Sequence, residues 1–590
     1  MKNRILLSGN GTYSNYRIPG LTVTAKGTLL AYFEARRTSS DWALMDILLF
    51  RSEDGGETFS DPIVIASGTE RFPTVNNPVC FAEKDGTLHV LYCRDYTVEG
   101  GHIFHRRSDD DGKTWSEPRD ILSATRPEYH NVLACGPGHG IVTDAGMLLV
   151  PVWLVPKDAK MPVREHHPAV VSTLGLSAGC ARSVAAAAKV LIVGGGAAGI
   201  SVAARLKGRL PNGKITIVDP AEKHFYQPGF TFIGAGVWGK DDVWMKEADL
   251  IPPGVTWVQE AVVSLDPAKN VAVTSGGRRL DYDFLVLCPG LQENWSLVEG
   301  ITRETLGVGN AHSIYDWEGS VRTWKAVSEF AAKGGRGVFA DTWTKHKCGG
   351  APKKICLLTE HLSRLNGTRE KLSFGYFTAE KALYDVPHYV PRLEAIYRER
   401  NVPIRVNAKL TGVDTAAKKA HFEDRKTGEK WIEEYDILHF APPQSAPDFV
   451  REAGLGWTEG KLAREAWAMV DKSTLVHLKY GNVIALGDVA GIPTSKTSAA
   501  IRKQAPIAVE NLLSLIAGEE PKATYDGYAA CPIITDYGHV IMAEFDYAKR
   551  PATSFPLNFL DTSKELRSGW WLKKYVLKPM YFQLMLRGLA

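Results

Sequence analysis

The sequence predicts a multidomain protein in which an all-β segment, residues 1–174, precedes an α/β region that begins at Lys189. Three observations predict this division. Residues 1–174 contain short apolar runs separated by Gly, Asp and Asn turns, as in antiparallel β structure. Strands alternate with helical stretches after Lys189. The length of 590 residues corresponds to about four domains rather than one.

Composition excludes several classes of protein. Hydrophobic residues make up 44% and charged residues 23% of the chain, the balance of ordinary globular protein. The net charge of +4 does not favour a nucleic-acid partner, and the positive charge is concentrated in residues 564–590. Eight cysteines without a C-x-x-C pair predict reduced thiols and no metal site. We expect neither a secretory signal nor a spanning helix, because no charged leader and no apolar run of about 18 residues occurs.

A repeated turn motif organises the first segment. Ser52–Phe59 and Ser108–Trp115 share the pattern S-x-D-x-G-x-T-aromatic, and their spacing suits the blades of a β-propeller. The Ser and Asp side chains are expected to bind nearby backbone amides, while Gly adopts positive φ and the aromatic ring packs beneath the hairpin. This spacing gives about three blades within residues 1–174. The small-residue stretch 175–188 is expected to be a linker.

The α/β region opens with a dinucleotide-binding signature. The apolar strand Lys189–Val193 leads into Gly194, Gly196 and Gly199 of a G-x-G-x-x-G motif, and a helical stretch follows. Asp219 ends the next strand, where an acid can bind a ribose hydroxyl. The glycines allow a pyrophosphate to approach backbone amides at a helix N-terminus. The sequence therefore predicts a dinucleotide site.

The far end of this region indicates that the dinucleotide is FAD. A strand ends at Gly487 and Asp488, a pattern typical of two-domain flavin disulfide reductases. Asp488 is expected to bind the ribityl chain, and the helix after Thr497 to point its N-terminus at the flavin. Lys496 either adds positive charge there or is a solvated lysine at a helix start. Nicotinamide binding is disfavoured, because the strand before Asp341 lacks a second glycine fingerprint.

Cys348 is the candidate reactive thiol. It precedes Gly-Gly-Ala-Pro and a helix that is expected to begin near Lys353. Cations and a helix start lower the pKa of a thiol and favour the nucleophilic thiolate. The lysines near Cys348 are Lys345, Lys347, Lys353 and Lys354.

The first segment resembles the opening of a six-bladed sialidase. The motifs that carry this resemblance are Tyr16–Pro19, Glu34–Arg36, Asp41, the two turn boxes and Gly136–Gly140. The resemblance implies that Arg17 and Arg36 belong to a carboxylate-binding site and that Asp41, or less favourably Asp46, is the acid/base residue. The later blades that supply the tyrosine nucleophile and its partners are missing. We therefore predict no sialidase activity; glycan binding, or a dimer that completes the ring, is the alternative.

Residues 189–590 resemble sulfide:quinone oxidoreductases. The motifs are His224–Pro228, Lys347–Pro352, Pro493–Thr497, Tyr525–Tyr528, Cys531-Pro532 and Ala543–Tyr547. The resemblance implies that redox cysteines capture sulfide sulfur, that two electrons pass through FAD, and that membrane quinone takes them. Cys348 matches one cysteine. The other is expected after the Gly-Asp pair, where this chain has Val489, so a two-cysteine relay is in doubt.

Three interpretations remain open at this point. The favoured one is that Cys348 acts alone and forms a persulfide or flavin adduct that an external sulfur acceptor clears. A second is that Cys356, Cys288 or Cys531 replaces the missing thiol. Cys356 lies about two turns along the same helix, where a direct disulfide would be strained, and Cys288 is expected to pack behind the FAD strand. The third is that the electron donor is not sulfide.

The same resemblance sets the expected domain boundaries and location. The FAD-binding domain comprises residues 189–297 and 423–522, an inserted Rossmann-like domain with the redox cysteine comprises 298–422, and residues 523–590 form a quinone- and membrane-associating region. The basic, aromatic segment 564–590 is expected to lie on a membrane surface, with packing on the domain or a dimer interface as the alternative. We predict a peripheral protein of a bacterial inner membrane, with homo-oligomerisation left open.

Overall fold

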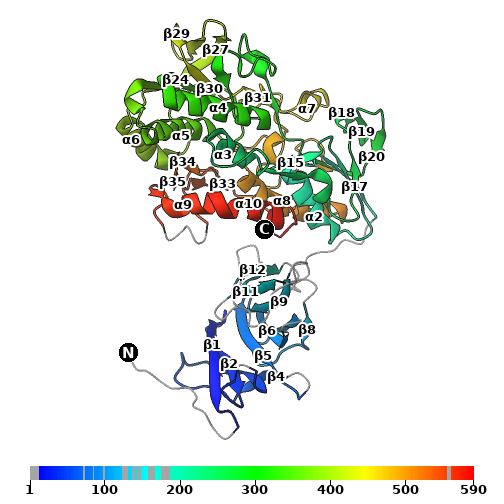
Figure 1. Ribbon diagram of the computed structural model, residues 1–590. Coiled ribbons are helices and arrows are strands. Elements are labelled where there is room, and N and C mark those ends of the chain that lie inside the picture. Colours follow the sequence, from blue (N-terminus) through cyan, green and yellow to red (C-terminus); the bar gives the residue numbers. More distant parts are fainter. Residues whose placement is uncertain are drawn as a thin grey trace. The chain divides into compact units, whose positions relative to one another are not determined.

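The computed structural model describes residues 12–40, 42–70, 73–83, 85–97, 100–121, 130–135, 140–142, 148–156, 167–173, 187–554 and 560–589. The chain divides into two compact units, Met1–Ala181 and Arg182–Ala590, and each is described by itself (Figure 1). The division falls within the expected linker 175–188, of which residues 175–186 lie outside the described part.

The described part of the N-terminal unit contains three antiparallel sheets, in agreement with the expected β-rich segment. The first has the order β1(Asn15–Val23), β2(Leu29–Arg36), β3(Met45–Ser52), β4(Ile63–Ser67), and the second β5(Val75–Ala82), β6(Leu88–Thr97), β7(Gly100–Ser108), β8(Arg119–Asp120). In the third, β11(Leu148–Pro156) pairs with β9(His130–Cys135), β10(Ile141–Val142) and β12(His167–Thr173). β3 is buried along its whole length, whereas the edge strand β1 exposes Leu21 and Val23.

Both turn boxes fold as the sequence predicts. In the first, Ser52 Oγ donates to Asp54 Oδ1 over 2.7 Å and Gly56 N–H donates to Ser52 Oγ over 2.8 Å. Asp54 also accepts from the amide and hydroxyl of Thr58, and these bonds hold the pKa of its carboxyl below the usual range. The second box repeats these bonds, with distances within about 0.1 Å. Gly56 has φ 94°, a value that glycine adopts without strain.

The C-terminal unit begins with a five-stranded parallel sheet of the dinucleotide-binding type. Its order is β17(Thr256–Val258), β14(Lys214–Val218), β13(Lys189–Val193), β21(Phe284–Leu287), β32(Val483–Ala485). The helices α2(Ala197–Lys207) and α8(Ser498–Ile516) pack against each other beside this sheet. Because β32 joins strands that precede it by about 200 residues, the domain built on this sheet is discontinuous in sequence.

A second five-stranded parallel sheet forms the inserted domain. Its order is β23(Ala311–His312), β30(Ile437–Phe440), β24(Gly335–Ala340), β25(Leu372–Phe377), β26(Ile404–Arg405), with α4(Trp317–Lys333), α5(Ala351–Leu365) and α6(Val390–Glu399) packed in the same domain. The expected boundary at residue 422 falls too early. β30 lies inside this sheet between β23 and β24, so the domain extends at least to Phe440.

Shorter strands and the C-terminal segment complete the unit. The antiparallel strands are β15(Lys223–Phe225), β16(Trp244–Lys246), β18(Val262–Asp266), β19(Val271–Thr274), β20(Arg279–Asp281), β22(Gln292–Glu293), β27(Ala408–Asp414), β28(Lys419–Asp424), β29(Lys430–Glu434), β31(Gln444–Ser445), β33(Ala529–Ala530), β34(Ile533–Asp536), β35(His539–Ile541), β36(Glu544–Phe545) and β37(Glu565–Leu566). The C-terminal helical segment runs through α9(Arg567–Trp571), η9(Leu572–Val576), α10(Leu577–Met580) and η10(Tyr581–Met585). Its first helix, α9, lies beside β35 (Figure 1). None of the described helices is long and apolar enough to cross a membrane.

Candidate flavin and thiol site

The glycine fingerprint is shaped for a dinucleotide. Gly194 has φ 107°, and a Cβ at this position would lie 2.3 Å from Cys288 O. A Cβ on Gly199 would lie 1.9 Å from Gly194 O, so both positions require glycine for steric reasons. At Gly196, the residue before the first turn of α2, a Cβ would meet nothing within 4 Å. Close packing behind the loop and open space at the helix N-terminus fit a bound pyrophosphate.

Asp219 lies directly against this loop. Its Oδ2 accepts a hydrogen bond of 2.6 Å from Gly195 N–H, and its Oδ1 accepts one of 2.8 Å from Ala221 N–H. Trp257 Nε1 donates to the Asp219 carbonyl over 3.0 Å. The carboxylate predicted to bind ribose is thus fixed by backbone donors beside the fingerprint.

The second predicted flavin motif lies at the end of β32. Gly487 has φ 74° and its N–H donates to Gln504 Oε1 of α8 over 2.8 Å. Lys496 Nζ donates to Asp488 O over 2.5 Å and to Ala490 O over 3.1 Å, and lies 3.7 Å from the centre of the Trp467 ring. Burial lowers the pKa of Lys496 to about 7. Lys496 is therefore held inside the site and is not a solvated lysine at a helix start.

The two motifs meet at Cys348. Cys348 N–H donates to Lys496 O over 3.0 Å, so the thiol loop and the loop after Asp488 are joined by backbone bonding. Cys348 itself has φ 51°, a left-handed conformation that is strained for a residue with a side chain. The predicted thiol is thereby placed beside the residues predicted to hold FAD.

The thiol that contacts Cys348 is Cys531. The two Sγ atoms lie 3.5 Å apart, and Lys354 Nζ donates to Cys348 Sγ over 3.0 Å. The hydrogen bond from Cys531 lowers the pKa of Cys348 well below its ordinary value, and the positive charge of Lys354 lowers it further. Burial of the thiol opposes both effects. The pKa of Cys531 is raised by its bond to Cys348 and by burial. These surroundings therefore favour the thiolate form at Cys348 and the thiol form at Cys531.

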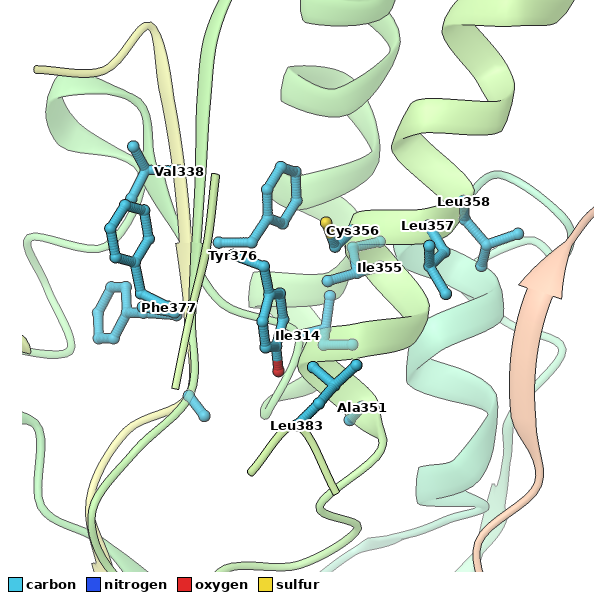
Figure 2. Close-up of a cluster of buried hydrophobic side chains, with 14 of the residues drawn as sticks. Ile314, Val338, Ala351, Ile355, Cys356, Leu357, Leu358, Tyr376, Phe377 and Leu383 are labelled. Carbon is cyan, nitrogen blue, oxygen red and sulfur yellow. The ribbon is translucent and has the colours of Figure 1, made fainter. Parts of the chain in front are cut away.

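The other candidate thiols lie elsewhere. Cys356 is fully buried in α5 among core side chains such as Ile355 and Tyr376 (Figure 2), and burial raises its pKa. Cys288 is buried behind the FAD strand, as expected, and its Sγ approaches Gly194 O at 3.6 Å. Val489 is completely buried in the core of the flavin domain. The structure thus brings together Cys348 and Cys531, not Cys348 and Cys356 or residue 489.

The lysines near Cys348 have different partners. Lys347 Nζ donates to Glu293 over 3.0 Å, and Lys353 forms a buried ion pair with Asp341 at 2.8 Å. Lys345 is exposed, and only Lys354 of the four bonds to the thiol. Sequence reasoning missed Lys573, which η9 of the C-terminal segment buries near Lys354 and the cysteines, so that burial lowers its pKa to about 7.

Three of the residues singled out by the sialidase resemblance, Arg17, Arg36 and Asp46, lie in the described part of the chain. Arg36 is buried, and its Nε donates to Glu34 Oε2 over 2.8 Å. Arg17 lies opposite Glu34 in the β1–β2 register and is exposed. Asp41, the predicted acid/base residue, lies outside the described residues, as do Gly136–His139. The alternative, Asp46, is buried and accepts a 2.5 Å bond from Tyr13 Oη.

These features define a flavoprotein with two Rossmann-like domains and an adjoining thiol pair. Residues 188–325 match the pyridine nucleotide-disulphide oxidoreductase family. The mitochondrial sulfide:quinone oxidoreductase of Dictyostelium discoideum is 38% identical over 401 residues, which cover 68% of this chain and 86% of the relative. The solved sulfide:quinone oxidoreductase of Aquifex aeolicus shares the fold, with a TM-score of 0.58 at 21% identity over 68% of this chain and 93% of that one. The chain belongs to the sulfide:quinone oxidoreductase family, a family of FAD-dependent enzymes.

The N-terminal segment has relatives of another kind. Residues 27–174 match the BNR repeat-like domain family. An exo-alpha-sialidase of Aspergillus fumigatus is 30% identical over 177 residues, which cover 25% of this chain and 43% of the relative. The chain spans less than half the length of that sialidase and joins this part to a flavoenzyme.

Proposed function

We propose that Cys348 and Cys531 are the redox pair with which this member of the family oxidises sulfide. The 3.5 Å separation of their sulfur atoms carries the proposal, because a small movement would close a disulfide bond. When bound, FAD would supply the two-electron chemistry of the reaction, with quinone as the electron acceptor. Asp219, Asp488 and the glycine loops would hold it beside the thiol pair.

The unequal pKa values of the two thiols predict which sulfur is attacked. In a disulfide the thiol of lower pKa is the better leaving group, and Cys348 has the lower pKa. Hydrosulfide would attack Cys531 Sγ, so that the S–S bond breaks, Cys531 becomes a persulfide and Cys348 leaves as a thiolate next to Lys354. A thiolate acceptor would then take the outer sulfur and leave Cys531 as a second thiolate. Oxidation of the two thiolates to the disulfide releases the two electrons.

Anaerobic reduction by sulfide tests this assignment. Sulfide should bleach the flavin band of the wild type, and a soluble quinone should restore it. Cys348→Ala and Cys531→Ala should each prevent bleaching by sulfide while flavin content is retained. Cys356→Ala is the matched control and should bleach normally. Normal bleaching of Cys531→Ala would favour the earlier interpretation in which Cys348 acts alone.

We infer peripheral membrane attachment through one face of the C-terminal segment. Trp571, Tyr575 and Val576 have exposed fractions of 64%, 50% and 41%, and aromatic side chains suit the membrane–water interface. Tyr581 and Leu586 pack in the flavin-domain core. The other face of the segment is therefore packed against its own domain and is not available to a membrane. A bacterial inner membrane and homo-oligomerisation stay predictions.

Point variants test the membrane face better than deletion of residues 564–590, because deletion would uncover the core. Trp571→Ala/Tyr575→Ala should reduce sedimentation with liposomes that contain anionic lipid. Leu365 has the same exposed fraction as Trp571, 64%, so Leu365→Ala is the control and should sediment like the wild type. Unchanged sedimentation of the double variant would contradict the attachment.

A further inference from the structure

A buried chain of three polar side chains connects the flavin domain to the C-terminal segment. His224 Nε2 lies 2.6 Å from Tyr581 Oη, and His224 Nδ1 lies 3.1 Å from Glu247 Oε2. All three side chains are at least 95% buried. Both hydrogen bonds form when the Tyr581 hydroxyl donates to His224 Nε2 and His224 Nδ1–H donates to the Glu247 carboxylate.

One atom at the end of this chain has no partner among the described residues. Glu247 Oε1 is buried and makes no hydrogen bond. It lies against the fingerprint loop, because a Cβ on Gly195 would be 2.6 Å from Oε1 and 2.9 Å from the Asp219 Cβ. Both oxygens of Asp219 already accept backbone hydrogen bonds. Glu247 therefore presents an acceptor without a hydrogen bond at the loop where the dinucleotide is expected to bind.

We propose that Glu247 binds a ribose hydroxyl of the dinucleotide and that the Glu247–His224–Tyr581 chain links cofactor binding to docking of the C-terminal segment. A carboxylate oxygen suits a hydroxyl donor, whereas it would repel a phosphate. A buried acceptor without a partner is costly, and a ligand hydroxyl removes that cost. The inference rests on FAD being the cofactor.

The C-terminal segment also touches the fingerprint helix directly. Ser201 Oγ of α2 donates to Met585 O over 3.1 Å, and a Cβ on Gly588 would lie 3.1 Å from Arg205. Residues 581–588 therefore contact both the helix whose N-terminus faces the cofactor and the polar chain that ends beside it. Because linkage between two binding events is reciprocal, bound FAD should hold this segment in place, and the docked segment should strengthen FAD binding.

Titration of the full-length apoprotein with FAD tests the binding residue. Glu247→Ala should weaken FAD binding about tenfold, the effect of losing one hydrogen bond to a charged group. Glu247→Gln, which keeps an acceptor for His224, should bind FAD more tightly than Glu247→Ala. Wild-type affinity in Glu247→Ala would overturn the inference. Absence of FAD binding by the wild type would instead overturn the cofactor assignment.

The linkage has its own test. Tyr581→Phe should weaken FAD binding although Tyr581 is separated from the loop by two side chains, and the double variant with Glu247→Ala should lose less than the sum of the single losses. Tyr575→Phe, on the exposed face of the same segment, is the control and should bind normally. FAD should slow proteolytic cleavage of the C-terminal segment in the wild type but not in Glu247→Ala. The linkage would be overturned if the losses of FAD-binding free energy in the two single variants add in the double variant. It would also be overturned if FAD protects the C-terminal segment from proteolysis equally in the wild type and in Glu247→Ala.

Discussion

Removal of the Lys354 ammonium should raise the pKa of Cys348 and slow its reaction with electrophiles. Lys354 Nζ donates to Cys348 Sγ over 3.0 Å, and both groups lie at the junction of the thiol and flavin loops. Lys354→Met keeps the length and apolar stem of the side chain while it removes the charge. The thiolate then retains its hydrogen bond from Cys531 but loses its cation.

Two estimates bracket the size of the effect. Coulomb attraction at 3.0 Å with an effective dielectric constant of about 20 gives about 5–6 kcal/mol. That figure is an upper bound, because burial of the lysine offsets part of it. A hydrogen bond to a charged group contributes about 1.5–3 kcal/mol net, which corresponds to a pKa increase of about 1–2. Below both pKa values, the thiolate fraction should fall about 10- to 100-fold.

Alkylation of the reduced protein measures this change. The rate of iodoacetamide addition to Cys348, followed by mass spectrometry of its peptide, should rise with pH to a plateau, and Lys354→Met should shift the midpoint upward. Lys345→Met removes an exposed lysine of the same loop and should leave the midpoint in place. An unchanged midpoint in Lys354→Met would refute the reasoning that this lysine stabilises the thiolate.

Three further predictions follow from other parts of the chain. The pKa of Lys573 is about 7 when folded and about 10.4 when unfolded, so the unfolded state binds more protons between these values. The stability of the wild type relative to Lys573→Met should therefore rise between about pH 7 and 10 in denaturant titrations. Asp54→Ala should lower the unfolding midpoint of the N-terminal unit without changing flavin content, whereas Glu53→Ala should change neither. The purified chain should not release fluorophore from a fluorogenic sialoside; turnover would contradict the predicted inactivity.

Features that depend on local sequence were predictable. The hydrogen bonds that define the two turns join residues four or fewer positions apart, such as Ser52 with Gly56, so the local sequence pattern predicts the turn. The glycine fingerprint was predictable for the same reason, because Gly194 and Gly199 contact each other within one strand–turn–helix unit. Such motifs predict the fold class and a dinucleotide site, while the choice of FAD rested on the separate motif at Gly487 and Asp488.

The thiol partner could not be found in this way. Cys348 and Cys531 are separated by 183 residues, and their contact depends on how the C-terminal strands pack on the inserted domain. Cys531 was one of three thiols considered as a replacement for the missing cysteine, but nothing in the local sequence favoured it over Cys356 or Cys288. Cys356 was closer in sequence, but the amphipathic α5 turns it into the core.

The strands of the flavin-domain sheet are far apart in sequence, and this separation affects how the domain folds during synthesis. Strand β21 ends at Leu287, and the strand that pairs with its open edge, β32, begins at Val483. About 195 residues separate them, so a ribosome adding about 5–20 residues per second needs roughly 10–40 s to supply the missing strand. During that interval the apolar strand β21 has an unpaired edge, which is a site for association with other nascent chains. The flavin domain should therefore depend on chaperones during translation more than the N-terminal sheets, whose strands are neighbours in sequence.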